Sequence, residues 1–101
     1  MGSDSPRLAT PLLNLAEVAL DRRDGDRARA LAGRARKVSE GQPAEPADQA
    51  DQLRIEARIA REIDGDEATA LARAREALDL ARKTPGARAL HRRLEAFLAG
   101  G

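Results

Sequence analysis

Apolar residues recur at helical spacing in five stretches of this 101-residue chain, and clusters of Gly, Pro and Asp separate the stretches. Apolar positions that repeat about every 3.6 residues predict amphipathic α-helices. We therefore expect an all-α domain of five antiparallel helices. The expected boundaries are a flexible N-terminal tail at 1–9 and a single domain at 10–99, in which a hairpin at 10–39, a loop at 40–46, a hairpin at 47–83 and a capping helix at 85–99 follow one another.

Two Asp-Gly-Asp triplets, at 24–26 and 64–66, mark the expected corners between paired helices. Gly readily adopts the left-handed backbone that ends a helix, and the Asp after it can accept the free N–H groups that begin the next one. We therefore expect Gly25 and Gly65 to end helices and the Asp after each to begin the next. The runs that follow match at an offset of forty residues, which indicates an internal repeat: Ala28, Ala30, Leu31 and Ala32 correspond to Ala68, Ala70, Leu71 and Ala72.

Proline positions predict three further helix starts. Proline in the first turn of a helix sacrifices no hydrogen bond, and a Thr before it can cap the free N–H groups. Thr10-Pro11 and Thr84-Pro85 are therefore expected to begin the first and fifth helices, and the third is expected to begin near Pro46 or Ala47.

The third expected helix differs from the others because it is apolar on two opposite sides. A helix of this kind must be covered on both sides, so we expect it to be the central element of the packing. Ala50, Leu53, Ala57 and Ala60 form one stripe, and Ile55, Ile59 and Ile63 form the other.

Charges are balanced, with 18 Lys and Arg against 17 Asp and Glu and a net charge of +1, and Phe97 is the only aromatic residue. A nucleic-acid-binding protein usually has a strong basic excess or aromatic residues for stacking, so no nucleic-acid partner is expected. No apolar run approaches the roughly 20 residues that span a membrane. We therefore expect no membrane partner and a cytoplasmic location.

The second expected helix carries a local basic cluster from Arg27 to Lys37. Acidic residues follow it closely in the sequence, so we expect these charges to be neutralised within the fold or solvated. An acidic partner is the alternative.

The sequence contains no set of residues typical of catalysis or metal binding. It has no Cys and one His, His91, and this pair of facts argues against a metal site. The carboxylates of the two triplets fit helix capping better than calcium binding, because the other ligands of a calcium loop are missing. We therefore expect no enzyme activity, no catalytic residues and no cofactor.

The corners and the helices after them resemble the tetratricopeptide repeat family. The resemblance covers roughly 10–99 and implies two helical hairpins followed by a capping helix. The residues that carry it are Gly65-Asp66, Ala70-Leu71, Ala74, Ala77-Leu78 and Leu80, with a weaker match at Gly25-Asp26, Ala30-Leu31 and Val38.

Members of this family are scaffolds that hold peptides or partner helices in a groove lined by the first helix of each hairpin. The resemblance therefore implies a non-catalytic adaptor that binds a peptide or amphipathic helix of another protein. It places Leu15, Ala19, Ile55, Ile59, Ile63 and Glu62 in the groove, with Arg22 and Glu62 setting orientation at the rim.

Two alternatives remain open at this stage. The isoleucine stripe is core packed against the fourth helix, instead of groove, if the third helix is slightly rotated. This interpretation is favoured because Arg54, Arg58 and Arg61 would otherwise be buried without partners. The chain is alternatively a homo-oligomerisation or structural module, or part of a larger helical-repeat protein.

Overall fold

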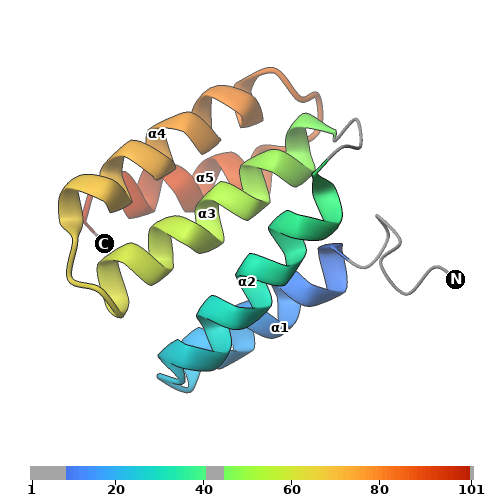
Figure 1. Ribbon diagram of the computed structural model, residues 1–101. Coiled ribbons are helices and arrows are strands. Elements are labelled where there is room, and N and C mark those ends of the chain that lie inside the picture. The colour runs from blue at the N-terminus through green and yellow to red at the C-terminus, as the bar shows by residue number, and fades with distance from the viewer. Residues whose placement is uncertain (1–8, 41–44, 101) are drawn as a thin grey trace, which may run out of the picture.

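The computed structural model describes residues 9–40 and 45–100. This part of the chain is all-α, as expected, and has no strands (Figure 1). Of the expected tail at 1–9, positions 1–8 lie outside the described residues, as do positions 41–44 of the expected loop, while Ala9 already belongs to the first helix. The five helices are α1 (Ala9–Asp21), α2 (Gly25–Ser39), α3 (Pro46–Glu62), α4 (Glu67–Arg82) and α5 (Arg88–Leu98).

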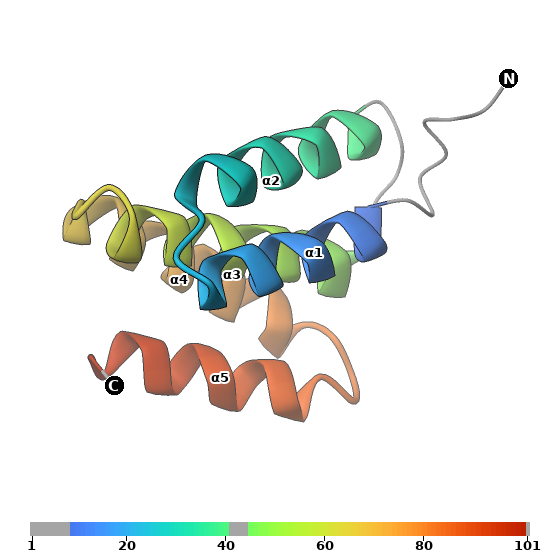
Figure 2. The same cartoon turned by 90° about the horizontal axis from the view of Figure 1, so that it is seen from below.

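Helix α3 lies at the centre of the fold, which confirms the expectation from its two apolar sides. The hairpin of α1 and α2 covers one side of α3, while α4 and α5 lie on the other side (Figures 1 and 2). Ile55 and Ile59 join a core cluster with α1 and α2. The opposite stripe, which includes Leu53 and Ala57, joins a second cluster with α4 and with Leu94 of α5.

The first corner differs from its sequence-based prediction. Helix α1 ends at Asp21, and Arg23 takes the left-handed backbone with φ of 62°, so Gly25 does not end the helix. The cap of α2 is Asp24, whose side chain accepts a hydrogen bond from the backbone N–H of Arg27 at 3.3 Å. The second corner is as expected, since Gly65 has φ of 66° and the side chain of Asp66 caps α4.

The offset of forty residues is also wrong as a structural register. At that offset Ala30 would match Ala70, yet Ala30 is exposed and Ala70 is buried. Buried positions correspond at 41 residues between α1 and α3, and at 42 residues between α2 and α4. Leu12, Ala16 and Ala19 correspond in this way to Leu53, Ala57 and Ala60, and Ala28, Ala32 and Ala35 correspond to Ala70, Ala74 and Ala77.

Two of the three helix starts predicted from proline are wrong. Helix α1 already includes Ala9 and Thr10, and α5 begins at Arg88, three residues after Pro85. Thr84 instead belongs to the end of α4, because its hydroxyl donates a hydrogen bond to the carbonyl oxygen of Leu80 at 3.0 Å. The start of α3 at Pro46 is confirmed.

Gly25 is needed for close packing and not for a left-handed turn. A Cβ atom at this position would lie 2.7 Å from Cγ2 of Ile63, a distance at which the Ile63 side chain or the backbone must shift. We expect Gly25→Ala to lower the free energy of unfolding by about 1–3 kcal/mol, as measured by urea unfolding.

Gly33 provides the matched control for this substitution. It lies within α2, and nothing approaches within 4 Å of a Cβ at this position. Gly33→Ala should therefore raise stability by about 0.5–1 kcal/mol, because Ala is the better helix former. Equal effects of the two substitutions would contradict the packing role of Gly25.

Candidate functional site

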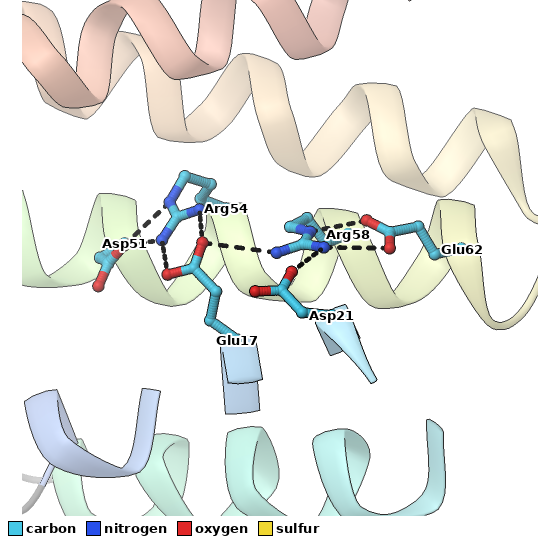
Figure 3. Close-up of polar contacts among 6 residues, drawn as sticks. All are labelled: Glu17, Asp21, Asp51, Arg54, Arg58 and Glu62. Carbon is cyan, nitrogen blue, oxygen red and sulfur yellow. Dashed lines mark hydrogen bonds and ion pairs between the residues drawn. The ribbon is translucent and has the colours of Figure 1, made fainter. Parts of the chain in front are cut away.

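A network of charged side chains joins α1 to α3 (Figure 3). Its centre is Arg54, which is only 7% exposed. Arg54 donates hydrogen bonds to the two carboxylate oxygens of Glu17, at 2.8 and 3.3 Å, and to Oδ1 of Asp51 at 3.0 Å. Such bidentate pairing satisfies a buried guanidinium group, so Arg54 lies in the fold without an uncompensated charge.

Arg58 extends the network by one helical turn. Its guanidinium donates to Oε2 of Glu62 at 2.6 Å and to Oδ1 of Asp21 at 3.1 Å, and a longer contact of 3.4 Å reaches Glu17. Glu17 and Asp21 on α1 thus face Arg54 and Arg58 on α3, with the same four-residue spacing on both helices (Figure 3). We call these six residues, including Asp51 and Glu62, the Arg54 network.

Electrostatics within the network favour the charged forms. The hydrogen bond from Arg54 lowers the pKa of Glu17, and the positive charges of Arg54, Arg58 and Arg93 add to this effect. Burial alone would lower the pKa of Arg54, but its hydrogen bond with Glu17 and the charge of Asp51 raise the pKa overall. Glu17 and Arg54 therefore hold opposite charges near neutral pH, and their ion pair holds α1 against α3.

The lowered pKa of Glu17 makes stability depend on pH in the acid range. A carboxyl group whose pKa is lower in the folded state stabilises the fold above its unfolded pKa, and this contribution is lost as pH falls through the folded pKa. With an ordinary value of 4.5 for Glu17, we expect the melting temperature to fall as pH is lowered below about 4.5. Glu17→Gln should flatten that dependence in thermal unfolding from pH 7 to pH 3, and an unchanged slope would contradict the assignment.

Arg61 makes a separate set of contacts near the end of α3. It lies over the ring of Phe97 in α5, 3.6 Å from the ring centroid, and donates to the carbonyl oxygen of Phe97 at 2.8 Å. It also forms a bidentate pair with Glu67 at the start of α4. Arg61 therefore ties α3, α4 and α5 together.

The residues predicted to form an apolar groove do not lie together on an open surface. Ile55 and Ile59 are 0% and 7% exposed and belong to the core, as the favoured alternative has it, although they pack against α1 and α2 instead of α4. Ala19 is buried as well, and Ile63 is partly buried against the same cluster. Glu62 is engaged in the Arg54 network. These five side chains therefore do not form an open apolar groove.

Two of the predicted site residues do lie on the surface, and a third exposed residue joins them. Leu15 is 47% exposed on α1, and the exposed Arg22 follows directly after the last residue of that helix, seven residues further along the chain. Val18, which the sequence analysis did not single out, is 46% exposed and lies between them at helical spacing. Leu15 and Val18 are the two large hydrophobic residues that are exposed in the described part of the chain. Their side of α1 is therefore the accessible apolar surface.

A depression of about 370 Å³ lies between α2, α3 and α4, and Gln52 lines it. The Gln52 amide nitrogen donates to the carbonyl oxygen of Ala32 at 3.0 Å and to Glu56 at 2.9 Å. The amide oxygen is buried and has no hydrogen-bond partner among the described residues. A buried unpaired acceptor costs free energy, so this residue is a weak point in the packing of α2 on α3.

The described residues contain no cluster of metal ligands and no helix suited to span a membrane. No group of three or more His, Asp or Glu side chains is arranged to hold a metal ion there. His91 is half-buried on α5 and lies 3.2 Å from a carboxylate oxygen of Glu95. None of the helices described is long and apolar enough to cross a bilayer.

Comparison with known proteins leaves the family of this chain open. Searches against protein-family models, curated proteins and solved structures find no match.

Proposed function

We propose that the chain is a non-catalytic interaction module that binds a peptide or amphipathic helix of a partner protein. The observation that carries the proposal is the exposed pair Leu15 and Val18, which places two large apolar side chains in water on one face of a well-packed helix. Apolar side chains on an exposed helix face can pack against an amphipathic helix of a partner. Arg22 on the same face supplies a charged group at the rim.

The resemblance to tetratricopeptide repeats supports this proposal at the level of architecture. The fold consists of two stacked helical hairpins and a fifth helix, and helical scaffolds of this kind commonly present a helix face to a partner. In the proposed binding mode, the partner contacts Leu15 and Val18 and leaves the buried isoleucines in the core.

A peptide library selected on the immobilised protein tests the proposal. Peptides enriched on the wild-type protein should bind at least about tenfold more weakly to a Leu15→Asp/Val18→Asp variant, because charge replaces the apolar contact. The variant should keep its helicity, since both positions are exposed. Enriched peptides that bind the variant equally well would overturn the proposed site.

The oligomeric state must be measured alongside, because the chain could use the same face for self-association. Size-exclusion chromatography with light scattering should show a monomer of 10.8 kDa across a concentration series. Detection by refractive index is required, since the chain has no Trp or Tyr. A dimer that Val18→Asp dissociates would favour a homo-oligomerisation module over an adaptor.

A further inference from the structure

The hairpin of α3 and α4, here called the second hairpin, has one face that packs against the first hairpin. Helix α2 lies on this face, and its arginines meet acidic residues there. Arg36 forms a bidentate pair with Glu56 at 2.6 Å for both hydrogen bonds, and Arg29 contacts Asp64 at 2.6 Å. Between these ion pairs, Ile59 packs in the apolar core cluster that includes residues of α2. On the second hairpin, an apolar centre bordered by acidic side chains is thus covered by a helix that carries arginines.

The first hairpin has an equivalent face, and no described element covers it. Leu15 and Val18 lie 41 residues before Glu56 and Ile59, and Arg22 lies 42 residues before Asp64. On α2, Leu31 lies 42 residues before Arg73, which lines the depression beside Glu56 and approaches its carboxylate at 3.9 Å. We call this surface the open face, and define it by the exposed Leu15, Val18, Arg22, Arg27 and Arg34 together with the half-buried Leu31.

The open face carries the opposite charge to its counterpart on the second hairpin. Arg22 and Arg34 occupy the positions that correspond to Asp64 and Glu76, and Arg27 corresponds to Thr69. These three arginines are exposed and have no ion-pair partner among the described residues. The fold therefore neutralises only part of the basic cluster on α2, through Arg29 and Arg36.

Acidic residues of α1 do not balance these arginines. Glu17 and Asp21 lie toward α3, where the Arg54 network holds them. The correspondence between the hairpins therefore places three guanidinium groups, unpaired among the described residues, on the same face as Leu15, Val18 and Leu31. Arg combines a charged group with a large contact area, and it is enriched at protein interfaces for that reason.

We propose that the open face docks an amphipathic helix whose apolar stripe is bordered by Asp or Glu side chains. The inference rests on the proposed function and adds the chemistry of the partner. The apolar stripe of the partner covers Leu15, Val18 and Leu31, and its carboxylates pair with the surrounding arginines. This arrangement repeats, with charges exchanged, the way in which α2 lies on the second hairpin.

Two synthetic helical peptides of about 15 residues test the proposal by fluorescence anisotropy. Both carry Leu at i, i+3, i+4 and i+7, and the flanking positions are Glu in one and Lys in the other. We expect the Glu peptide to bind at least about tenfold more tightly, and its affinity to fall as salt is raised. An Arg22→Glu/Arg27→Glu/Arg34→Glu variant should reverse the preference.

The matched control makes the same change of net charge at arginines on another part of the surface. Arg75, Arg88 and Arg92 are exposed on α4 and α5, and Arg75→Glu/Arg88→Glu/Arg92→Glu changes the net charge equally. This variant should keep the preference for the Glu peptide. Loss of the preference in the control would show a general charge effect and would overturn the proposal.

Other outcomes separate this inference from the proposed function. If library peptides require Leu15 and Val18 but the Glu and Lys peptides bind equally, the interaction site stands and the acidic partner is refuted. Binding of a single-stranded oligonucleotide more tightly than the Glu peptide would also refute it, as would a dimer that Val18→Asp dissociates. If no peptide depends on Leu15 and Val18, the proposed function itself fails.

Discussion

Ile59→Asp is expected to unfold the protein. The side chain is 7% exposed and lies in the core cluster that joins α3 to α1 and α2. The substitution removes buried apolar contacts and places a carboxylate in an apolar cluster, and together these effects should cost about 5 kcal/mol or more. Small domains have only about 5–15 kcal/mol of stability. We therefore expect most of the helical circular dichroism at 222 nm to be lost near room temperature.

Val18→Asp is the matched control for this substitution. Val18 lies 41 residues before Ile59 and occupies the corresponding place on α1, but it is 46% exposed. The change should alter the free energy of unfolding by no more than about 0.5 kcal/mol. If Ile59→Asp instead keeps full helicity and loses only peptide binding, Ile59 belongs to a binding groove and the assignment to the core is wrong.

The central place of α3 could be predicted because its apolar pattern is unusual. The pattern shows two stripes on one helix, and a helix of that kind can only be stable between two layers. The partners of each stripe could not be assigned in the same way. Ile55 and Ile59 pack on α1 and α2, and this depends on how the hairpins stack, which local periodicity does not specify.

The burial of Arg54 shows a second limit of the sequence. The sequence favours a core position for the isoleucine stripe because Arg54 would otherwise be buried without a partner, yet Arg54 is only 7% exposed in the fold. The cost is offset by Glu17, which lies 37 residues earlier on another helix. A signal was nevertheless present, because Glu17 and Asp21 share the four-residue spacing of Arg54 and Arg58.

The two corners show why similar sequence does not ensure similar local structure. Both contain Asp-Gly-Asp, but only Gly65 takes the left-handed backbone, whereas Arg23 takes it at the first corner. Close approach of Ile63 leaves no room for a side chain at Gly25, so a tertiary contact selects the glycine there. Turn chemistry alone therefore predicted the second corner correctly and the first incorrectly.

The candidate site was predicted only in part. Leu15 and Arg22 are exposed as a binding surface requires, but the other residues of the predicted groove are buried by tertiary packing or held in ion pairs. Val18 has the same helical spacing and could have been chosen on that ground. What the sequence could not supply is the stacking of the hairpins, which covers one outer face and leaves the other open.

Glu17→Leu is expected to lower the free energy of unfolding by about 2–3 kcal/mol, as measured by urea unfolding. Arg54 is 7% exposed, and without Glu17 only Asp51 remains to compensate its charge. Loss of one partner from a buried ion pair costs more than the pair itself contributes, because the remaining charge stays desolvated. The damage should therefore come from the stranded Arg54 and not from the missing carboxylate.

The double variant Glu17→Leu/Arg54→Met separates these two causes. Two apolar side chains of similar size can fill the same space without a desolvated charge, so the double variant should recover most of the lost stability. Asp21→Asn is the control for a pair at the exposed end of the network, where 64% of the aspartate side chain is exposed, and it should cost no more than about 1 kcal/mol. If the double variant is as unstable as Glu17→Leu alone, the stability comes from attraction between Glu17 and Arg54, and the unpaired charge of Arg54 is not the cause of the loss.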